Sequence, residues 1–359
     1  MTLAVIIPVY NSSRLLRETL IAVQSGARYP DELIVVDDGS TDDSAEVARQ
    51  FGAQVIVMEA NAGPAACRNQ AALRSTSELL AFLDADTCVH ADTLEMMERH
   101  FLQDPTLAAV IGAYDDTPRD PGLCSQYRNL AHCYVHRDAH RNALTFWSGC
   151  GGVRRSVFLD ADGFDERFHR PSIEDIEFGY RISDKGSRIL LDPSITVTHT
   201  KRWTVWNSIH TDVLDRGIPW MVLLLERGRV PDDLNLKKRH RVATALTGLS
   251  IVCFGYAFRS PSWFIPAIVL AASAVCLDFG LLWFIYRTGG GRVFAVAVPM
   301  TLVQNICKLI AFLGGLLIFA LRRHPLRRLR RGQRRSKIME NRRVVEQQQI
   351  GPSRHGPRS

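Results

Sequence analysis

The sequence has few cysteines for its length, and no two of them are spaced as a CxxC pair. Eight cysteines are spread over 359 residues. This scarcity excludes a small domain held by disulfides, and the missing CxxC spacing argues against a zinc ribbon or a thioredoxin-like site. Cys253, Cys276 and Cys307 lie in apolar runs, where a free thiol behaves as a small hydrophobic group. We therefore expect reduced thiols and a cytosolic compartment.

The first ten residues also lack the basic segment that opens a secretory signal peptide. Their short apolar run, MTLAVIIPVY, is interrupted by Pro8. We expect this run to form a buried strand. Hydrophobic residues make up 46% of the chain and charged residues 23%, which is ordinary for a packed protein and excludes disorder throughout.

Positive charge is scarce in most of the chain and concentrated at its end. The formal net charge is +7, but residues 322–359 contain 13 Lys/Arg and 2 Asp/Glu, which leaves a net charge of −4 on the remainder. A body of this charge is not typical of a nucleic-acid-binding protein, so we expect no nucleic acid partner. The basic segment follows an apolar region and favours an anionic membrane surface as its partner. We expect residues 322–359 to form a disordered cytoplasmic tail.

Short apolar runs alternate with helical patterns in the first hundred residues. The expected strands lie at 3–7, 32–36, 54–58 and 79–83, and the expected helices at 13–24, 42–51, 64–74 and 91–103. This alternation indicates βαβ units and a mainly parallel sheet, in an α/β catalytic domain covering residues 1–236. In such sheets ligands bind where the strands end.

Three longer apolar runs follow, at 242–258, 264–286 and 293–321. At 1.5 Å per residue they reach roughly 25, 34 and 43 Å, against about 30 Å of hydrocarbon. Basic clusters at 237–241 and 322–337 should both stay cytoplasmic, which requires an even number of spans. We therefore predict a membrane region at 237–321 with two spanning helices, 264–286 and 293–321, and an interfacial or re-entrant segment at 242–258.

Two charged residues, Asp278 and Lys308, fall inside the two predicted spans. They could form an intramembrane pair, which would be functional by default. They could equally face protein or lie near the end of a span.

Acidic side chains follow the expected strands. Asp84 and Asp86 come directly after the strand at 79–83, and two carboxylates one residue apart at a strand end suit a hard cation such as Mg²⁺ or Mn²⁺ with substrate phosphates. Asp37 and Asp38 end the strand at 32–36, where a carboxylate can accept hydrogen bonds from a ribose or a base. Their neighbours Ser40 and Thr41 are ordinary turn and helix-capping residues.

Three further side chains have both a functional and a structural interpretation. Arg68 could add positive charge to the same pocket, or it could be a solvated helix residue. Asp175 could be a general base, or it could be an acid in the first turn of a helix, where it suits the dipole. His199 ends a strand-like run and could join Asp84 and Asp86 at a metal ion, although a lone histidine is more often structural.

The ordered segments VIIPVYN (5–11), VVDDGSTD (35–42), NAGPAACRN (61–69), FLDAD (82–86), DGFDE (162–166) and ED (174–175) together resemble the family 2 inverting glycosyltransferases of the GT-A fold. The resemblance covers roughly residues 3–205. It implies a Rossmann-like sheet and a nucleotide-diphospho-sugar donor, most often a UDP-sugar. It also implies Mg²⁺ or Mn²⁺ as the cofactor.

The resemblance assigns a role to individual positions of this chain. It implies nucleotide binding by Pro8, Tyr10, Asp38, Arg68 and Asp84, metal binding by Asp84, Asp86 and His199, and catalysis by Asp175 as the base that activates the acceptor. On the acceptor side we expect Trp147, Gly151, Glu174, Arg202 and Trp203.

The chain departs from the processive synthases that carry a Gln-x-x-Arg-Trp motif, because His199 stands where the glutamine would be. We therefore expect an enzyme that moves one sugar to a hydroxyl or phosphate of a lipid or lipid-linked acceptor, as a multi-pass inner- or plasma-membrane protein with a cytoplasmic catalytic domain. A processive polysaccharide synthase is the alternative. A catalytically silent nucleotide-sugar-binding scaffold is a second alternative, which the retained acids disfavour.

Overall fold

A computed structural model of the chain describes residues 1–323. The strands are β1 (Leu3–Val9), β2 (Glu32–Asp37), β3 (Gln54–Val57), β4 (Leu79–Leu83), β5 (Thr87–Val89), β6 (Leu107–Tyr114), β7 (Asn142–Ala143), β8 (Cys150–Arg154) and β9 (Arg188–His199). They form one sheet in the order β3-β2-β1-β4-β8-β6-β9-β5, with β7 paired to β9. The expected N-terminal strand is present as β1.

The sheet is parallel in one half and mixed in the other. β3, β2, β1 and β4 run parallel, whereas β8 is antiparallel to both β4 and β6, and β5 is antiparallel to β9. The prediction of a mainly parallel sheet therefore holds for the first four strands in the order and for the β6–β9 pair, whereas β8, β5 and β7 pair antiparallel. The difference arises because β8 enters from residues 150–154 and lies between β4 and β6, a long-range pairing that no local pattern indicates.

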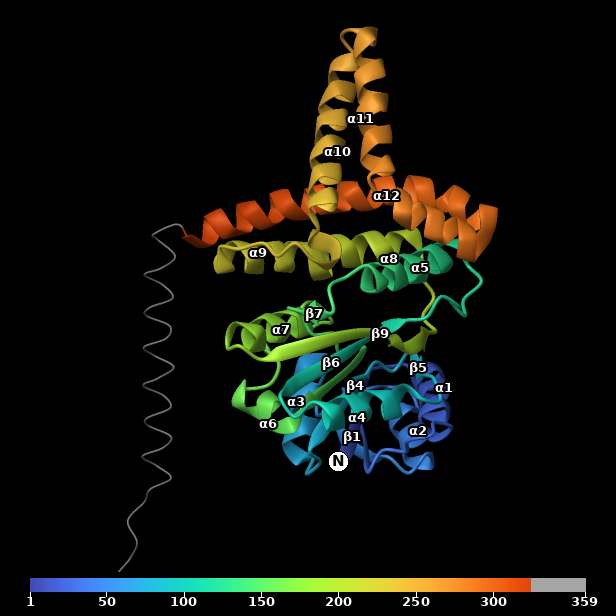
Figure 1. Cartoon of the computed structure of the whole chain (residues 1–359), viewed down its shortest axis with the longest axis vertical. Helices are drawn as coiled ribbons and strands as arrows, with labels where there is room; N and C mark the ends of the chain where they lie inside the picture. The colour runs from blue at the N-terminus through green and yellow to red at the C-terminus, as the bar shows by residue number, and fades with distance from the viewer. Residues whose placement is uncertain (324–359) are drawn as a thin grey trace, which may run out of the picture.

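Helices cover both faces of the sheet (Figure 1). The helices of this part are α1 (Ser13–Gln24), α2 (Ser44–Gln50), α3 (Pro64–Arg74), α4 (Thr93–Gln103), α5 (Leu123–Arg137), α6 (Arg155–Asp160) and α7 (Glu174–Asp184). Residues of α1, α2 and α4 pack on one face and residues of α3, α6 and α7 on the other. The pleat of β1 divides its side chains in the same way, with Val5 and Ile7 on the first face and Ala4 and Ile6 on the second.

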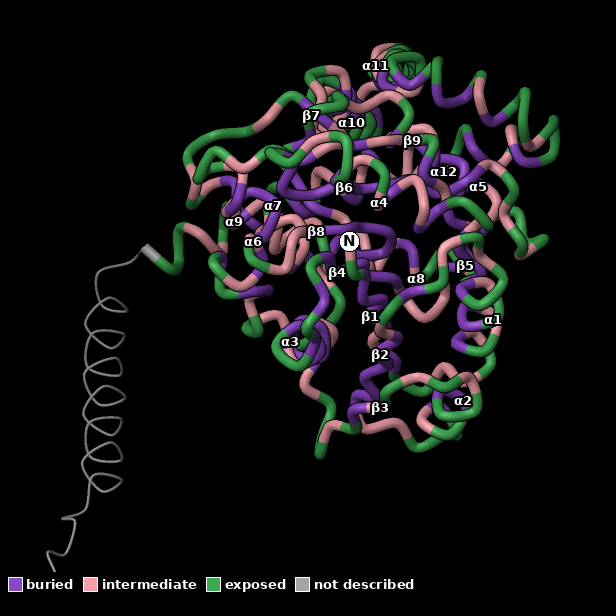
Figure 2. Tube along the Cα trace, turned by 60° about the horizontal axis from the view of Figure 1, so that its bottom comes forward, coloured by how far each residue is buried: buried purple, intermediate pink, exposed green. Residues whose placement is uncertain are grey.

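Figure 2 shows how this arrangement buries the strands while the outer helix surfaces stay exposed. Eleven of the thirteen residues of β1 and β2 are buried, and the carboxyl ends of these strands meet at one edge of the domain. Pro8, Tyr10, Asp38 and Asp84 lie at or just after such strand ends. The motifs are therefore placed where parallel sheets bind ligands.

A second group of helices lies against α5. It comprises α8 (Val205–His210), the π-helical turn η1 (Thr211–Gly217), α9 (Ile218–Arg227), the short 3-10 turns η2 (Leu234–Leu236) and η3 (Pro261–Trp263), α10 (Lys238–Ala257), α11 (Phe264–Cys276) and α12 (Phe279–Arg323). α10 and α11 form a hairpin that projects away from the sheet, and α12 runs across its base (Figure 1). α12 is interrupted at Gly290, where the backbone has φ 75° and ψ 179°.

The helix boundaries in this region differ from the two predicted spans. The segment 264–286 is divided, since α11 ends at Cys276 and α12 begins at Phe279. The reason is Asp278, which is buried at the turn with its carboxylate 3.0 Å from Nδ1 of His240 on α10. The segment 242–258 is part of the 20-residue helix α10.

Within residues 1–323, one helix is long and apolar enough to cross a membrane, at Phe279–Arg322. This helix, α12, packs against α5, α9 and η1. Gly314 and Gly315 allow the close approach to α9, because a Cβ at Gly315 would come within 2.6 Å of Met221. Length and composition alone are thus weak evidence for a membrane span here. The predicted basic tail falls, apart from Arg322 and Arg323, outside the described residues.

Candidate active site

A cleft of about 810 Å³ opens at the carboxyl ends of β1, β2 and β4. All five residues that we predicted to bind the nucleotide line it, namely Pro8, Tyr10, Asp38, Arg68 and Asp84. The predicted base Asp175 and the predicted metal ligands Asp86 and His199 line it too. The fold thus gathers side chains from both ends of the catalytic domain around one space, which has the size of a ligand pocket. We call this space the donor cleft.

The carboxylate of Asp38 is held by the loop that precedes α3. It accepts hydrogen bonds from the backbone N–H of Ala62 at 2.7 Å and of Gly63 at 2.9 Å. Gly63 has φ 92°, and a Cβ there would lie 2.5 Å from the carbonyl oxygen of His169. Only glycine fits this conformation and this space, so the loop keeps Asp38 in a fixed position.

Arg68 connects the donor cleft to α7. Its guanidinium lies 2.6 Å from Asp84 and 3.1 Å from Glu174, and the arginine side chain is only 4% exposed. Burial, together with the charge of Asp175, raises the pKa of Glu174. Arg68 is therefore a buried bridge between two carboxylates, and not the solvated helix residue of the structural interpretation. Glu174, which we expected on the acceptor side, lies in the donor cleft with Arg68.

His199 faces Asp86 and is oriented by a third side chain. Its Nδ1 lies 2.8 Å from the amide oxygen of Asn129, and its Nε2 lies 3.6 Å from Asp86. The contact with Asn129 orients the ring so that Nε2 faces the Asp86 carboxylate. The ring stacks on Tyr114 with centroids 4.6 Å apart. Burial opposes ionisation of Asp86, but the hydrogen bond and charge of His199 outweigh it and lower the Asp86 pKa.

This arrangement gives a partial set of ligands for a cation. In residues 1–323 no three or more His, Cys, Asp or Glu side chains are grouped so that they could hold a metal ion by themselves. Asp86 and His199 nevertheless present an oxygen and a nitrogen to the same point in the donor cleft. Phosphate oxygens of a bound substrate are the usual remaining ligands of such ions. The residues present fit a divalent ion that is shared with a diphosphate.

Asp175 lies in the first turn of α7 and is oriented by the loop that precedes β8. Its Oδ2 accepts hydrogen bonds from the backbone N–H of Ser148 at 3.0 Å and from the Ser148 hydroxyl at 3.2 Å. Its Oδ1 accepts from the N–H of Ile176 at 2.8 Å. The side chain is fixed at the wall of the donor cleft, which a general base requires.

The remaining predicted acceptor-side residues are not all near the cleft. Trp147 and Trp203 line it, and the Trp203 ring lies 4.9 Å from the Arg128 guanidinium carbon. Arg202 is exposed and does not line the donor cleft. Gly151 is buried in β8, where a Cβ would come 2.4 Å from the carbonyl oxygen of Trp147, so it serves close packing. Trp147 and Trp203 thus line the donor cleft, and Arg202 and Gly151 do not.

Sequence reasoning missed several side chains of the donor cleft. Arg216 comes from the π-helical turn, Lys201 follows His199, and His132 comes from α5. A π-helical turn is frequent at functional sites, but it has no sequence signature that could have indicated Arg216. Lys201 precedes Arg202, which we predicted on the acceptor side. Burial keeps the imidazole of His132 neutral by lowering its pKa well below the ordinary value.

Residues 4–161 match the sequence model of glycosyl transferase family 2. This segment is a glycosyl transferase family 2 domain. The matched segment contains β1 to β4 with Asp38, Arg68, Asp84 and Asp86, whereas Asp175 and His199 lie beyond it. The prediction of a family 2 domain with an α/β fold of the GT-A type is confirmed.

Among curated relatives, the chain is 31% identical over 208 residues to a pre-mycofactocin glycosyltransferase of Mycobacterium tuberculosis. The alignment covers 55% of this chain and 42% of that relative. The chain thus spans less than half the length of this relative.

Two solved structures are similar over most of the chain. The mannosyltransferase PcManGT from Pyrobaculum calidifontis, in complex with GDP-Man and Mn²⁺, has a TM-score of 0.50 at 19% identity and covers 88% of this chain and 86% of its own. TarS 1-349 of S. aureus, in complex with UDP-GlcNAc, also has a TM-score of 0.50, at 17% identity, with 87% and 89% covered. At these identities the likeness shows the fold.

Proposed function

We propose that the protein is an inverting glycosyltransferase. It transfers a sugar from a nucleotide-diphospho-sugar, with UDP as the expected nucleotide, to a hydroxyl group of a lipid or lipid-linked acceptor presented at a membrane. The observation that carries this proposal is the convergence of Asp38, Asp84, Asp86 and Asp175 on one cleft of about 810 Å³. These acids come from two separate strand ends and from a helix, and packing alone does not require them to meet.

The nucleotide is expected against Pro8, Tyr10 and Asp38, and its diphosphate near Asp84 and Asp86. Tyr10 is 50% exposed at the rim of the donor cleft, so its ring is free to contact a base. The similar structures bind GDP-Man in PcManGT and UDP-GlcNAc in TarS, which supports a nucleotide-sugar donor for this chain and leaves either nucleotide compatible with the fold.

We infer that Asp86 and His199 hold a divalent cation together with the donor diphosphate. Asn129 supports this assignment, since it orients the imidazole with Nε2 toward Asp86, as partners of metal-binding histidines do. A bound Mg²⁺ or Mn²⁺ supplies charge neutralisation to the departing diphosphate. The Mn²⁺ in the PcManGT complex supports the inference.

Asp175 is expected to act as the base. It takes the proton of the acceptor hydroxyl while that oxygen bonds to the anomeric carbon and the bond from this carbon to the diphosphate breaks. Ser148 holds the carboxylate in place through two hydrogen bonds. Attack opposite the leaving group inverts the anomeric configuration.

The helical hairpin supports a membrane location. α10 has 20 residues, about 30 Å of helix, which equals the thickness of the hydrocarbon layer. Large apolar side chains are exposed on the hairpin, including Phe254 at 50%, Ile265 at 70% and Ile268 at 66%. Lys238, Arg239 and Arg241 lie at its base. We propose that the hairpin enters the bilayer from the side of the catalytic domain, with both of its ends on that side.

The product tests this proposal against both alternatives. Purified protein in lipid nanodiscs is incubated with UDP- and GDP-sugars and membrane lipids, and the products are analysed by mass spectrometry. A lipid with one added sugar of inverted configuration supports the proposal. A polymer would establish the processive synthase, and nucleotide binding without any transfer would establish the scaffold.

A further inference from the structure

A second cavity, of about 260 Å³, adjoins the donor cleft on the side of the C-terminal helices. It lies between α5 and the segments η1, α9 and α12. Asp175, Trp147, His132 and Arg216 line both spaces. The cavity and the donor cleft therefore meet at the proposed base. We call this second space the acceptor cavity.

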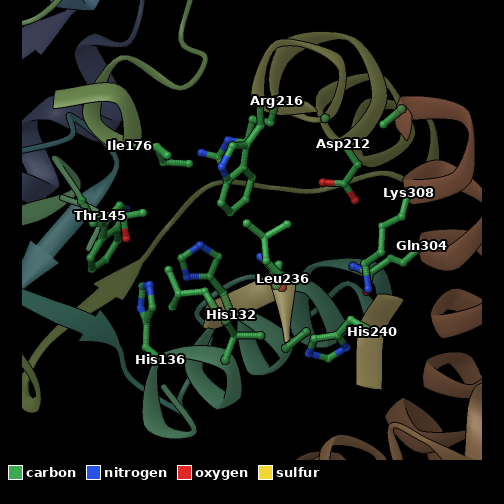
Figure 3. A pocket seen from close by; sticks show the side chains of 18 of the residues that line it. His132, His136, Thr145, Ile176, Asp212, Arg216, Leu236, His240, Gln304 and Lys308 are labelled. Carbon is green, nitrogen blue, oxygen red and sulfur yellow. The ribbon is translucent and has the colours of Figure 1, made fainter. Parts of the chain in front are cut away.

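The middle of the acceptor cavity is apolar. Trp220 and Leu224 of α9, Leu236 of η2, and Leu281 and Phe312 of α12 contribute to its wall. Figure 3 shows Leu236 among the polar side chains, with His132, His136 and Thr145 on one side and Asp212, Gln304 and Lys308 on the other. A ligand that fills this space needs an apolar body and polar groups at its ends.

Most charges in the acceptor cavity are already matched by opposite charges. Arg128 forms a bidentate pair with Asp212 through both of its terminal nitrogens. Lys308 interacts electrostatically with Asp278 and Asp212, and the uncharged imidazole of His240 lies 3.0 Å from Asp278. Asp278 and Lys308, which could have formed an intramembrane pair or faced protein, both face this cavity inside the protein. They leave no surplus charge for an ionic ligand.

The charge of Arg216 is not matched in this way. Within residues 1–323 it has no ion pair or hydrogen bond, and it lines the donor cleft as well as the acceptor cavity. Its charge interacts with Asp84, where the donor diphosphate is expected. We therefore assign its free charge to the donor side.

Uncharged hydrogen-bonding groups remain at the acceptor cavity. Nδ1 of His136 and Nε2 of His240 are buried and have no hydrogen-bond partner in the described part of the chain. The two side chains belong to residues that are 5% and 6% exposed. An unpaired buried polar atom is costly, so a polar group of a ligand would relieve both sites. Burial keeps His136 neutral, since it lowers its pKa to about 4.

We propose that the acceptor cavity binds the acceptor and that the acceptor is a neutral amphiphile with a free hydroxyl, either an uncharged lipid alcohol or an uncharged glycolipid. This inference rests on the proposed function. A lipid phosphate would place an anion among charges that are already balanced, and an unmatched buried charge is strongly unfavourable. A hydroxyl also explains the base, because an ionised phosphate oxygen has no proton to remove.

The reaction balances with this acceptor. The hydroxyl proton passes to the Asp175 carboxylate, and the hydroxyl oxygen bonds to the anomeric carbon. The bond from that carbon to the diphosphate breaks, and the nucleoside diphosphate leaves with the electron pair. The products are a glycosylated lipid and a nucleoside diphosphate.

Photocrosslinking of the full chain in nanodiscs tests the proposal. Two probes carry the same diazirine-bearing alkyl chain: one is a diacylglycerol and the other a polyprenyl phosphate analogue. We expect the neutral probe to label peptides of α9 and α12 and to be displaced by unlabelled diacylglycerol. The variant Leu236→Trp, which fills the acceptor cavity, should lose this labelling several-fold, whereas Leu214→Trp, on an exposed position of the neighbouring turn, should retain it.

Nucleotide binding separates this inference from the proposed function. Leu236 does not line the donor cleft, so Leu236→Trp should still bind the nucleotide, which also shows that the variant is folded. Preferential labelling by the phosphate probe, equal labelling of the Leu236→Trp variant, or no labelling by either probe would overturn the neutral-acceptor assignment while nucleotide binding persists. Loss of nucleotide binding in the unaltered protein would instead contradict the proposed function.

Discussion

The guanidinium of Arg68 lies 2.6 Å from the carboxylate of Asp84, although the two residues come from a helix and from the end of a strand. The same guanidinium reaches Glu174, so one buried cation holds Asp84 against the start of α7. This contact links the donor side of the site to the helix that carries Asp175. Its integrity should therefore affect both folding and donor binding.

Replacing Arg68 with Gln should destabilise the fold by about 3–5 kcal/mol, because it leaves the buried carboxylate of Glu174 without its cation. Thermal unfolding in detergent measures this change. The matched control is Arg74→Gln, an exposed arginine on the same helix, which should change stability by less than about 0.5 kcal/mol. Equal stability of the two variants would show that the buried bridge does not stabilise the native state.

Asp175→Asn should leave nucleotide binding intact and lower turnover by at least ~10²-fold, because an amide cannot take the acceptor proton. Release of the nucleoside diphosphate in the presence of acceptor measures turnover, and calorimetry measures binding. Asp184→Asn, at the opposite end of α7 and away from the donor cleft, is the control and should be active. Unchanged turnover of Asp175→Asn would remove this residue from the role of base.

Acid should destabilise the protein through His136. Its pKa is lowered to about 4 from the model-peptide value of 6.5, so the unfolded chain binds more protons between these values and stability falls as pH decreases from 6.5 to 4. The loss from this residue is about 3 kcal/mol at most. Unfolding measured across this pH range should be less pH-dependent in His136→Phe than in the control His140→Phe, which alters an exposed histidine. A parallel pH dependence of both variants would contradict the assignment.

Charges placed on the hairpin should weaken membrane binding. Ile265→Asp combined with Ile268→Asp places two carboxylates on an exposed face of α11, at a cost of about 3 kcal/mol each within a bilayer. Flotation with vesicles measures the effect. The control is Ile21→Asp. Ile21 lies on α1 and is 51% exposed, so this variant should bind vesicles as the unaltered chain does. High salt should not release the unaltered protein if apolar contacts hold it, whereas release by salt would assign retention to the basic tail.

The sequence was most informative where local patterns determine structure. Strands and helices alternate with a clear period in the first hundred residues, and the acids that follow β2 and β4 consequently fall at one sheet edge. The position of β8 between β4 and β6 could not be predicted, because it depends on a pairing between residues about 70 apart. The contact of Glu174 with Arg68 could not be predicted for a similar reason, since the two residues are 106 apart.

Apolar runs were less informative about the C-terminal region. Hydropathy identifies helices that avoid water, but it cannot distinguish a helix facing lipid from one facing protein. α12 is the most apolar long helix, yet Gly314 and Gly315 pack it onto α9. The less apolar α10, with Ser250 and Thr247 facing inward, projects with α11 instead. Arg216 escaped prediction because a π-helical turn brings it to the donor cleft.

The central claim is that Asp86 and His199 hold a divalent ion with the diphosphate of a nucleotide-sugar. Calorimetric titration of the purified protein with UDP and with GDP, with and without Mn²⁺, tests it most directly. We predict Mn²⁺-dependent binding of UDP that Asp86→Asn loses and that Asp92→Asn, an exposed acid before α4, retains. Preference for GDP would keep the mechanism and change the donor. Binding of neither nucleotide, or binding that is indifferent to Mn²⁺ and to Asp86, would contradict the account.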